Sequence, residues 1–98
     1  MLSIVNQKLV VKAQVIARIF DDEYIIYNIQ TGDTHLLDGV SGELLELLLK
    51  QTMSRDQLLQ NLSLWFDELN ADELNTYLDD FIARFINLDL LKFVKQPV

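Results

Sequence analysis

The sequence has no cysteine and a single histidine, and both shortages limit the chemistry that it can perform. Without cysteine the chain cannot form disulfides, thiolate metal sites or a cysteine nucleophile, and an intracellular location is the natural expectation. A zinc site built on His35 would need its remaining ligands from carboxylates alone, which is an uncommon set. A solvent-facing or hydrogen-bonded strand histidine is the simpler interpretation, so we expect no metal and no cofactor.

Long apolar runs, proline and glycine are also scarce. No apolar stretch approaches the roughly 20 residues that span a bilayer, and the first residues lack the pattern of a secretory signal peptide. Pro97 is the one proline, and the three glycines are scattered rather than gathered in a phosphate-binding loop. We therefore expect a cytoplasmic protein that neither spans a membrane nor binds a nucleotide.

Basic residues are few, with 8 lysines and arginines against 15 aspartates and glutamates and a net charge of −7. All the acidic residues lie at or after Asp21, whereas the segment before it holds Lys8, Lys12 and Arg18. Nucleic-acid binding depends on neutralising phosphates with lysine and arginine, and anionic membranes attract the same residues. The charge thus argues against nucleic-acid and membrane partners.

No group of residues has the pattern of a catalytic site. The acidic residues Asp21, Asp22 and Glu23 lack the spaced oxygen ligands and the glycine of a calcium loop. Asp79 and Asp80 are adjacent, and adjacent positions of a helix point about 100° apart, so the two carboxylates do not converge on one reacting atom. We expect no enzymatic activity.

The region from residue 10 to residue 38 is rich in Val, Ile, Tyr, Phe and Thr, which is the composition of pleated strands. The strands that fit it are residues 15–20, 24–29 and 34–37. The acidic residues between the first two strands suit a hairpin tip, and Gly32 can adopt a positive φ in the second turn. Alternation along the second strand separates two faces, one of which should pack on helices.

Helical spacing follows the strands and predicts three helices. Their N-terminal signals are Ser41 for the first helix, Ser54 with Gln57 for the second, and Asn70 with Glu73 for the third, the last two pairs being capping boxes. The leucines of residues 44–49 indicate that the first helix is deeply buried. The third helix should end near residue 87, and residues 90–93 form a tail that returns to the core.

The edges of the predicted sheet are candidate binding elements. A three-stranded antiparallel sheet has two edges, and an open edge can accept a peptide as a further strand. Main-chain hydrogen bonds then provide affinity, and neighbouring pockets provide specificity. The alternative is that the N-terminal segment or a second copy of the chain covers the edge. The residues alone leave these possibilities equally placed.

The stretch from Tyr24 to Asp38, YIIYNIQTGDTHLLD, resembles the PqqD-like family, and in particular the branch named for the HPr-rel-A system. That branch similarly has a tyrosine-asparagine strand, a Ser/Thr-Gly turn and the residues Thr-His-Leu-Leu. The leucines of residues 44–48 and the Leu-Asp-Leu-Leu of residues 88–91 also fit, so the resemblance covers roughly residues 15–93. The motifs are short, and their order and spacing carry the specificity. The basic, valine-rich N-terminal segment does not match the family core.

The resemblance implies an α+β, winged-helix-like fold, with a three-stranded antiparallel sheet followed by three helices. The domain would be residues 15–95, with residues 1–14 as an N-terminal extension or extra strand. In the family, a leader peptide adds as a strand beside the third strand and lies in a groove against the third helix. Carried over by position, the backbone edge would be Thr34, His35, Leu36, Leu37 and Asp38, and the groove positions would be Tyr77, Phe81, Arg84, Phe85 and Leu88.

Some of these assignments have simple alternatives. Phe81 and Phe85 have the spacing of core residues, and such residues are more often buried than in contact with a ligand. Arg84 is a cation among apolar residues on an acidic helix, so it could pair with an acidic side chain of a peptide. Its alternative partner is Asp80, four residues earlier on the same helix. Tyr77 and Arg84 are therefore the stronger candidates for contact.

The leading hypothesis is a non-catalytic peptide chaperone that binds the leader of a precursor peptide and presents it to a separate modifying enzyme. A second hypothesis is a winged-helix regulator of DNA or of a protein, although the acidic third helix, with Arg84 as its one cation, would repel phosphate. A third is an obligate homodimer in which the N-terminal segment of one copy fills the sheet edge of the other.

Overall fold

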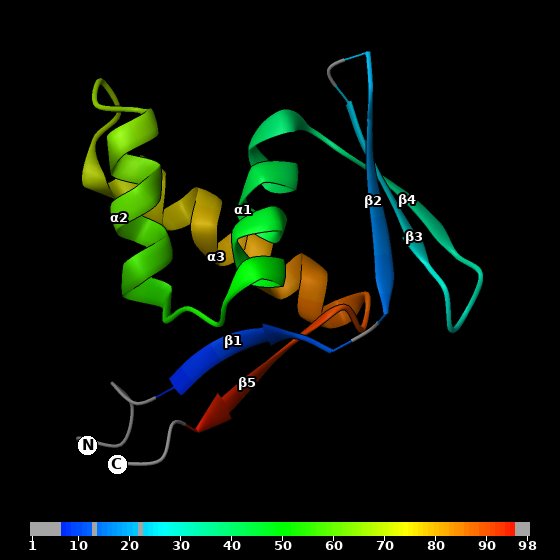
Figure 1. Cartoon of the computed structure of the whole chain (residues 1–98). Helices are drawn as coiled ribbons and strands as arrows, with labels where there is room; N and C mark the ends of the chain where they lie inside the picture. The colour runs from blue at the N-terminus through cyan, green and yellow to red at the C-terminus, as the bar shows by residue number, and fades with distance from the viewer. Residues whose placement is uncertain (1–6, 13, 22, 96–98) are drawn as a thin grey trace.

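The computed structural model describes residues 7–12, 14–21 and 23–95, and Figure 1 shows their arrangement. The elements in chain order are β1 (Gln7–Val11), β2 (Val15–Phe20), β3 (Glu23–Asn28), β4 (Thr34–Leu37), α1 (Gly39–Lys50), α2 (Arg55–Trp65), α3 (Ala71–Asn87) and β5 (Leu91–Lys95). The fold is α+β and winged-helix-like, with an antiparallel three-stranded sheet followed by three helices, as the sequence predicts. A second sheet, of β1 and β5, is added to that plan.

The three-stranded sheet has the order β2-β3-β4, so β2 and β4 are its edges. The predicted strands 15–20 and 34–37 are confirmed, and β3 begins and ends one residue earlier than predicted. The predicted hairpin tip joins β2 to β3, with Phe20 paired to Glu23. Asp22, within that tip, lies outside the described residues. The β-branched and aromatic residues therefore form strands where their composition predicts them.

The turn between β3 and β4 is organised by Asn28, which is 4% exposed. Its side-chain oxygen accepts hydrogen bonds from the backbone N–H groups of Gln30 and Thr31 at 2.9 and 3.3 Å. Its backbone carbonyl accepts the N–H of Gly32 at 2.8 Å, and Gly32 has a φ of 81°. A glycine adopts this left-handed conformation without steric cost. The buried asparagine and the glycine together direct β4 back along β3.

The N-terminal segment forms β1, which pairs antiparallel with β5 near the other end of the chain. Leu9 of β1 is fully buried and exchanges backbone hydrogen bonds with Met53 at 2.7 and 3.4 Å. Leu90 and Leu91, at the start of the C-terminal tail, are at most 1% exposed. The prediction that this tail returns to the core is confirmed, and the tail does so as a strand.

The pairing of β1 limits the possible roles of the N-terminal segment. Residues 7–11 pair with β5, so they cover neither edge of the three-stranded sheet. Lys12, one of the basic residues of the segment, forms an ion pair with Asp89 at 2.5 Å. Within the predicted extension of residues 1–14, residues 1–6 and 13 lie outside the described residues. The described part of the segment is thus an extra strand within its own chain.

The helix starts follow the capping residues. The capping boxes predicted for α2 and α3 are confirmed, and α3 ends at Asn87 as expected. α1 begins at Gly39, two residues before the predicted Ser41, because Asp38 is its N-cap and accepts the N–H of Ser41 at 2.7 Å. The leucine pattern of α1 starts only at Leu44, so its first turn carries no periodic signal.

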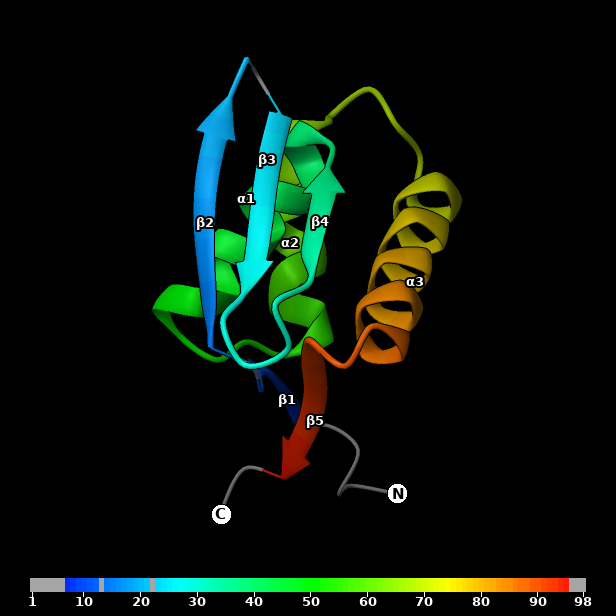
Figure 2. The ribbon, with the colours of Figure 1, turned by 90° about the vertical axis from the view of Figure 1, so that its right-hand side faces the viewer.

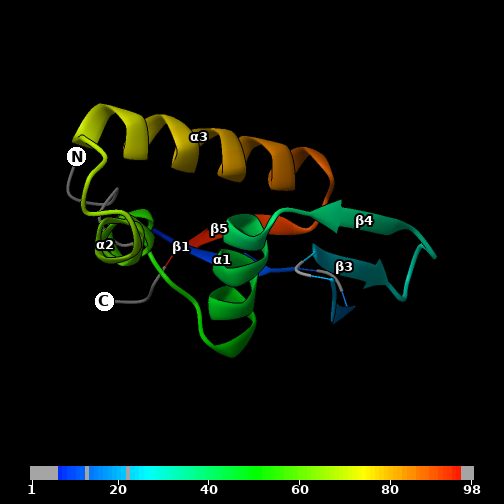
Figure 3. The same cartoon turned by 90° about the horizontal axis from the view of Figure 1, so that it is seen from above.

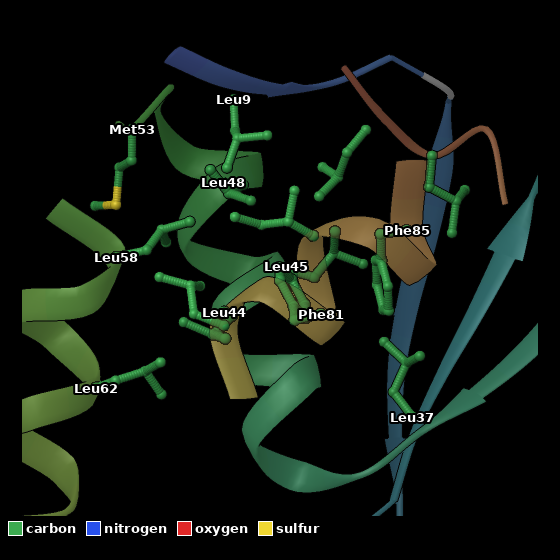
Figure 4. Packing of buried hydrophobic residues seen from close by; sticks show 14 of the residues in the cluster. Leu9, Leu37, Leu44, Leu45, Leu48, Met53, Leu58, Leu62, Phe81 and Phe85 are labelled. Carbon is green, nitrogen blue, oxygen red and sulfur yellow. The ribbon is translucent and has the colours of Figure 1, made fainter. Parts of the chain in front are cut away.

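The core is filled mainly by leucines of the helices. Figure 3 shows α1 between α2 and the sheet, with α3 running past all of them. The largest fully buried side chains are those of Phe85, Leu9, Ile26, Leu44, Leu45, Leu58, Leu62, Leu78, Leu90 and Leu91. Figure 4 shows side chains from α1, α2, α3, β1 and β4 meeting in this cluster. One core thus joins the helices to both sheets.

α1 packs directly on β3 through Gly42 and Tyr24. A Cβ atom on Gly42 would lie 2.1 Å from the Tyr24 ring, so only glycine allows this approach. The Tyr24 hydroxyl donates to Glu46 Oε1 at 2.9 Å. Burial, followed by this hydrogen bond and the charge of Glu46, raises the pKa of Tyr24 to about 12. The hydroxyl therefore remains a donor, and the sheet is held against α1.

Candidate functional site

The backbone of β4 faces β3 on one side and the open edge of the sheet on the other. Hydrogen-bonded and non-bonded residue pairs alternate along an antiparallel ladder. The N–H of Asn28 donates to the carbonyl of Asp33 at 2.8 Å, so Asn28 and Asp33 are a hydrogen-bonded pair and every second pair after them is bonded as well. The backbone groups of His35 and Leu37 therefore point to β3, and those of Thr34 and Leu36 point to the open edge. A strand added here would pair with Thr34 and Leu36.

α3 lies alongside this edge without pairing with it, as Figure 2 shows. The Nη2 atom of Arg84 donates to the carbonyl oxygen of Leu36 at 3.4 Å. The guanidinium carbon of Arg84 also lies 5.6 Å from the centroid of the Phe85 ring, within the range of a cation–π interaction. Arg84 is thus the side chain that joins α3 to the open edge of β4.

A polar cluster of Asp38, Ser41 and Tyr77 joins the end of β4, the first turn of α1 and the middle of α3. Asp38 Oδ1 accepts the N–H of Ser41 at 2.7 Å and the hydroxyl of Tyr77 at 3.2 Å. The Tyr77 hydroxyl also lies 2.8 Å from the Ser41 hydroxyl. Ser41 is 4% exposed, and these contacts satisfy its hydroxyl. The cluster fixes how far α3 stands from the sheet edge.

The electrostatics of this cluster keep Asp38 charged and Tyr77 neutral. Partial burial favours the neutral form of Asp38, but hydrogen bonds from Ser41 and Tyr77 and the charge of Arg84 outweigh it and lower the pKa of the carboxyl. Burial raises the pKa of Tyr77, and the neighbouring Asp38 carboxylate adds to the effect. At neutral pH the cluster is a carboxylate held by neutral donors.

A hollow of about 150 Å³ opens between β4, the start of α1 and α3. Its lining residues are Asp38, Ser41, Tyr77, Asp80, Phe81 and Arg84. A wider depression of about 590 Å³ shares Asp38 and Tyr77 with it and extends toward Ile19 of β2. Both are open to solvent and lie beside the three-stranded sheet. Arg84, which lines the smaller hollow, bonds the Leu36 carbonyl, so the hollow is placed to receive side chains of a strand added to β4.

The structure brings together only part of the predicted site. Thr34, Leu36 and Asp38 are exposed at the edge; from α3, Arg84 bonds Leu36 and Tyr77 bonds Asp38. His35 is half-buried, Leu37 is 3% exposed and Leu88 is half-buried at the end of α3. Phe81 and Phe85 are 3% and 0% exposed, with ring centroids 4.5 Å apart. The two phenylalanines support the groove from inside the core, and contact between them and a peptide stays a prediction.

Sequence reasoning does not assign to the site two residues that line the smaller hollow, Ser41 and Asp80. It treats Ser41 only as a helix start, although a position three residues after an aspartate is the spacing of an N-cap and its bonded N–H. It treats Asp80 only as a neighbour of Asp79 and as an alternative partner of Arg84. Among the described residues the ion pairs are Lys12–Asp89 and Arg55–Asp79, so the alternative pairing of Arg84 with Asp80 is not formed.

The arrangement of the described residues does not support a site for a metal ion, a membrane-spanning helix or a phosphate contact on α3. Among residues 7–12, 14–21 and 23–95, no group of three or more His, Asp or Glu side chains is placed to hold a metal ion. Within the same ranges, no helix combines the length and apolarity needed to cross a membrane. On α3, Asp72, Glu73, Asp79 and Asp80 outnumber Arg84, which disfavours contact with phosphate.

Comparison with known proteins gives one informative match. No family model matches this sequence, and no curated protein matches it either. Among solved structures, the chain is similar to TbiB1 in complex with the TbiA(beta) leader peptide, with a TM-score of 0.72 and 22% sequence identity. The alignment covers 85% of this chain and 94% of that one. The chain therefore has the fold of TbiB1 over most of its length.

Proposed function

We propose that this chain is a non-catalytic recognition domain that binds the leader segment of a precursor peptide at the open edge of β4. The carrying observation is that Thr34 and Leu36 direct their backbone groups away from β3, beside a hollow lined by α3. The fold is shared with TbiB1, which was solved with a leader peptide. The resemblance of residues 24–38 to the PqqD-like family supports the same role. The proposal places the protein in the cytoplasm.

The edge of β4 can supply part of the affinity but not all of it. Thr34 and Leu36 direct two N–H donors and two carbonyl acceptors to the open edge, and in the free chain Arg84 occupies the Leu36 carbonyl. At about 0.5 to 1.5 kcal/mol for each net hydrogen bond, the remaining groups contribute roughly 2 to 5 kcal/mol. The cost of association consumes much of that gain. Side-chain contacts in the hollow beside Tyr77 and Arg84 must therefore provide the remaining affinity and the specificity.

The proposal assigns catalysis to a separate modifying enzyme to which the bound precursor is presented. The cluster of Asp38, Ser41 and Tyr77 has two hydroxyls and a carboxylate but no imidazole, and Tyr77 has a raised pKa that keeps it protonated. The carboxylate is engaged as the N-cap of α1 and as the acceptor of the Tyr77 hydroxyl, so we assign it no role as a catalytic base. The cluster instead positions the two sides of the groove, and the chemistry belongs to the partner.

The test is an NMR titration of the isotopically labelled chain with synthetic leader peptides from precursors encoded beside it. We expect saturable shifts at the amides of Thr34 and Leu36 and along α3 from Tyr77 to Leu88. Shifts confined to β2, or none with a folded chain, would count against the proposal for those peptides.

A matched pair of proline variants tests which edge is used. Thr34→Pro removes an outward N–H at the start of β4, where proline is tolerated in a strand, and should weaken binding about three- to tenfold, the loss of roughly one hydrogen bond. The N–H of Ile29 donates to the carbonyl of Gln14, so Gln14 begins the alternation of bonded and non-bonded residues along β2, and Ala17 directs its N–H away from β3. Ala17→Pro therefore removes an N–H at the outer edge of β2. Ala17→Pro should leave the affinity unchanged.

The second candidate function is a structural dimer formed through the other edge of the sheet. On β2, Ile19 is 61% exposed and Phe20 is 65% exposed, and a long apolar edge strand favours pairing with another chain. Residues 7–11 pair within the chain, so a dimer would use β2 itself rather than the N-terminal segment. A molecular mass that rises with concentration and is restored to the monomer by Ala17→Pro would favour this candidate.

A further inference from the structure

Arg84 occupies a hydrogen-bonding position that an added strand would need. Its Nη2 atom donates to the carbonyl oxygen of Leu36 at 3.4 Å, and that oxygen points to the open edge of β4. Strand addition requires the same oxygen to accept an N–H of the incoming peptide. In the free chain, Arg84 therefore occupies the Leu36 carbonyl, which is one of the groups that would bind the added strand.

Arg84 keeps unused hydrogen-bonding capacity in this position. A guanidinium group has five N–H donors, and the contact with Leu36 uses one of them. No carboxylate of the described residues lies within 4.0 Å of it, since the ion pairs there are Lys12–Asp89 and Arg55–Asp79. The nearby Asp38 carboxylate is already engaged by Ser41 and Tyr77. Arg84 is thus a cation with spare donors beside the groove.

We infer that Arg84 determines specificity by exchanging the Leu36 carbonyl for an acidic side chain of the bound peptide. This inference rests on the proposed function. When a peptide N–H takes the Leu36 oxygen, the guanidinium group loses its acceptor while it remains over the Phe85 ring. A carboxylate from the peptide provides a charge-assisted hydrogen bond in fork geometry, whereas beside a neutral peptide the exposed guanidinium group has only water in place of the Leu36 carbonyl.

The sheet geometry also indicates where in the peptide the acid should be. A residue directly opposite Leu36 has its side chain on the same face as Leu36, which is 59% exposed on the outer side of the sheet. The residues on either side of it in the peptide point to the other face, as do His35 and the buried Leu37. That face is the one toward α3. The acidic residue should be an immediate neighbour of the residue that pairs with Leu36.

The first measurement needs no peptide. In the free protein, the carbonyl ¹³C chemical shift of Leu36 should change on Arg84→Gln, because the carbonyl loses its donor. The matched control is Arg55→Gln, which removes a surface arginine paired with Asp79, away from β4. It should leave the Leu36 shift in place. An unchanged Leu36 shift in Arg84→Gln would overturn the inference.

The second measurement uses synthetic versions of the leader peptide in which one position at a time is Glu or Gln. At a position next to the Leu36 partner, the wild-type protein should bind the Glu peptide about three- to tenfold more tightly. Arg84→Gln should abolish that preference and bind the Gln peptide at least as well as the wild type does. Arg84→Lys should retain only part of the preference, because lysine keeps the charge without the fork.

The outcomes separate this inference from the function on which it rests. Peptides that bind the wild-type protein at β4 with no preference for Glu at any position would overturn the role of Arg84 and leave the recognition function standing. A preference that survives in Arg84→Gln would have the same meaning. Failure of every leader peptide to bind would instead overturn the recognition function, and the specificity with it.

Discussion

The two sheets of this molecule differ in how far their most exposed apolar side chains reach into solvent. In the sheet of β1 and β5, Leu9 and Leu91 are at most 1% exposed, and Phe93 is 41% exposed. In the sheet of β2, β3 and β4, Ile19, Phe20 and Leu36 are each about 60% exposed, with values of 61, 65 and 59%. Exposed apolar residues gathered on one sheet mark a surface for contact more often than isolated ones do. The first sheet joins the two ends of the described chain, and the second leaves large apolar side chains exposed on both of its faces.

The largest expected effect comes from opening the closed sheet. Leu9→Ala should lower the free energy of unfolding by about 2 to 5 kcal/mol, because it leaves a cavity among fully buried leucines. Phe20→Ala on the open sheet is the matched control and should change it by about 0.5 kcal/mol or less. Urea denaturation followed by circular dichroism measures both. Equal costs would mean that Phe20 is buried in solution, by a second copy or otherwise.

The attachment of the open sheet to the helices can be broken at Gly42. Gly42→Ala should cost about 1 to 3 kcal/mol, because the new methyl group collides with the Tyr24 ring. Gly39→Ala in the same helix meets nothing within 4 Å and should be neutral or slightly stabilising. Thermal unfolding of the two variants would show whether α1 and β3 are in the close contact described.

The acid sensitivity of the β4 side should depend on Asp38. Asp38→Ala should cost about 1 kcal/mol at pH 7, the typical value for loss of an N-cap. The folded protein holds the pKa of Asp38 below its ordinary value of 3.8, so the ionised carboxylate stabilises the fold above that pH. That contribution is lost as the pH falls through the lowered pKa. The stability difference between wild type and Asp38→Ala should therefore shrink below about pH 4.

Asp38→Asn is the control for this prediction, because asparagine still caps a helix but does not titrate. Its stability relative to Asp38→Ala should stay constant over the same pH range. The measurement is the denaturation midpoint of each protein from pH 7 to pH 2. If the difference between wild type and Asp38→Ala did not narrow, the stabilising role of the ionised Asp38 carboxylate would be wrong.

The smallest effect is expected at the surface of the closed sheet. Lys12→Gln removes the ion pair between Lys12 and Asp89. The side chain of Lys12 is 37% exposed and that of Asp89 is 77% exposed. Exposed pairs contribute about 0.2 to 1 kcal/mol, and salt screens them. The difference from wild type should vanish in concentrated sodium chloride. A larger loss that salt removes would show that the β1–β5 sheet depends on this charge pair and not mainly on Leu9. A loss that salt does not change would show that Lys12 acts through something other than its charge.

The local parts of the fold were predictable, and the parts that depend on distant pairing were not. Gly32 and the capping residues Ser54 and Asn70 act within a few positions of themselves, so their patterns located a turn and the starts of α2 and α3. β1 pairs with a strand at the other end of the chain, and no local signal indicates such a partner.

The same division applies to the candidate site. The open edge at Thr34 and Leu36 follows from strand order, which the sequence predicted. The orientation of α3 relative to that edge does not follow from strand order, because it depends on how side chains pack in the core. Phe85 and Arg84 are neighbours in sequence, yet one is fully buried and the other bonds the Leu36 carbonyl. Only the tertiary structure distinguishes the residues of α3 that pack in the core from those that lie at the sheet edge.

The register of β1 and β5 has a consequence for protein engineering. Gln7 is directly opposite Lys95, so the described chain enters and leaves the fold at one point. Figure 2 shows that point at the far end of the molecule from the end of β4 where α1 begins. A short linker between Gln7 and Lys95, with new termini opened at Asp67 and Glu68 in the exposed loop between α2 and α3, would give a circular permutant that keeps β4 and its turn intact. The domain could likewise be inserted into a host protein through the same pair of strand ends.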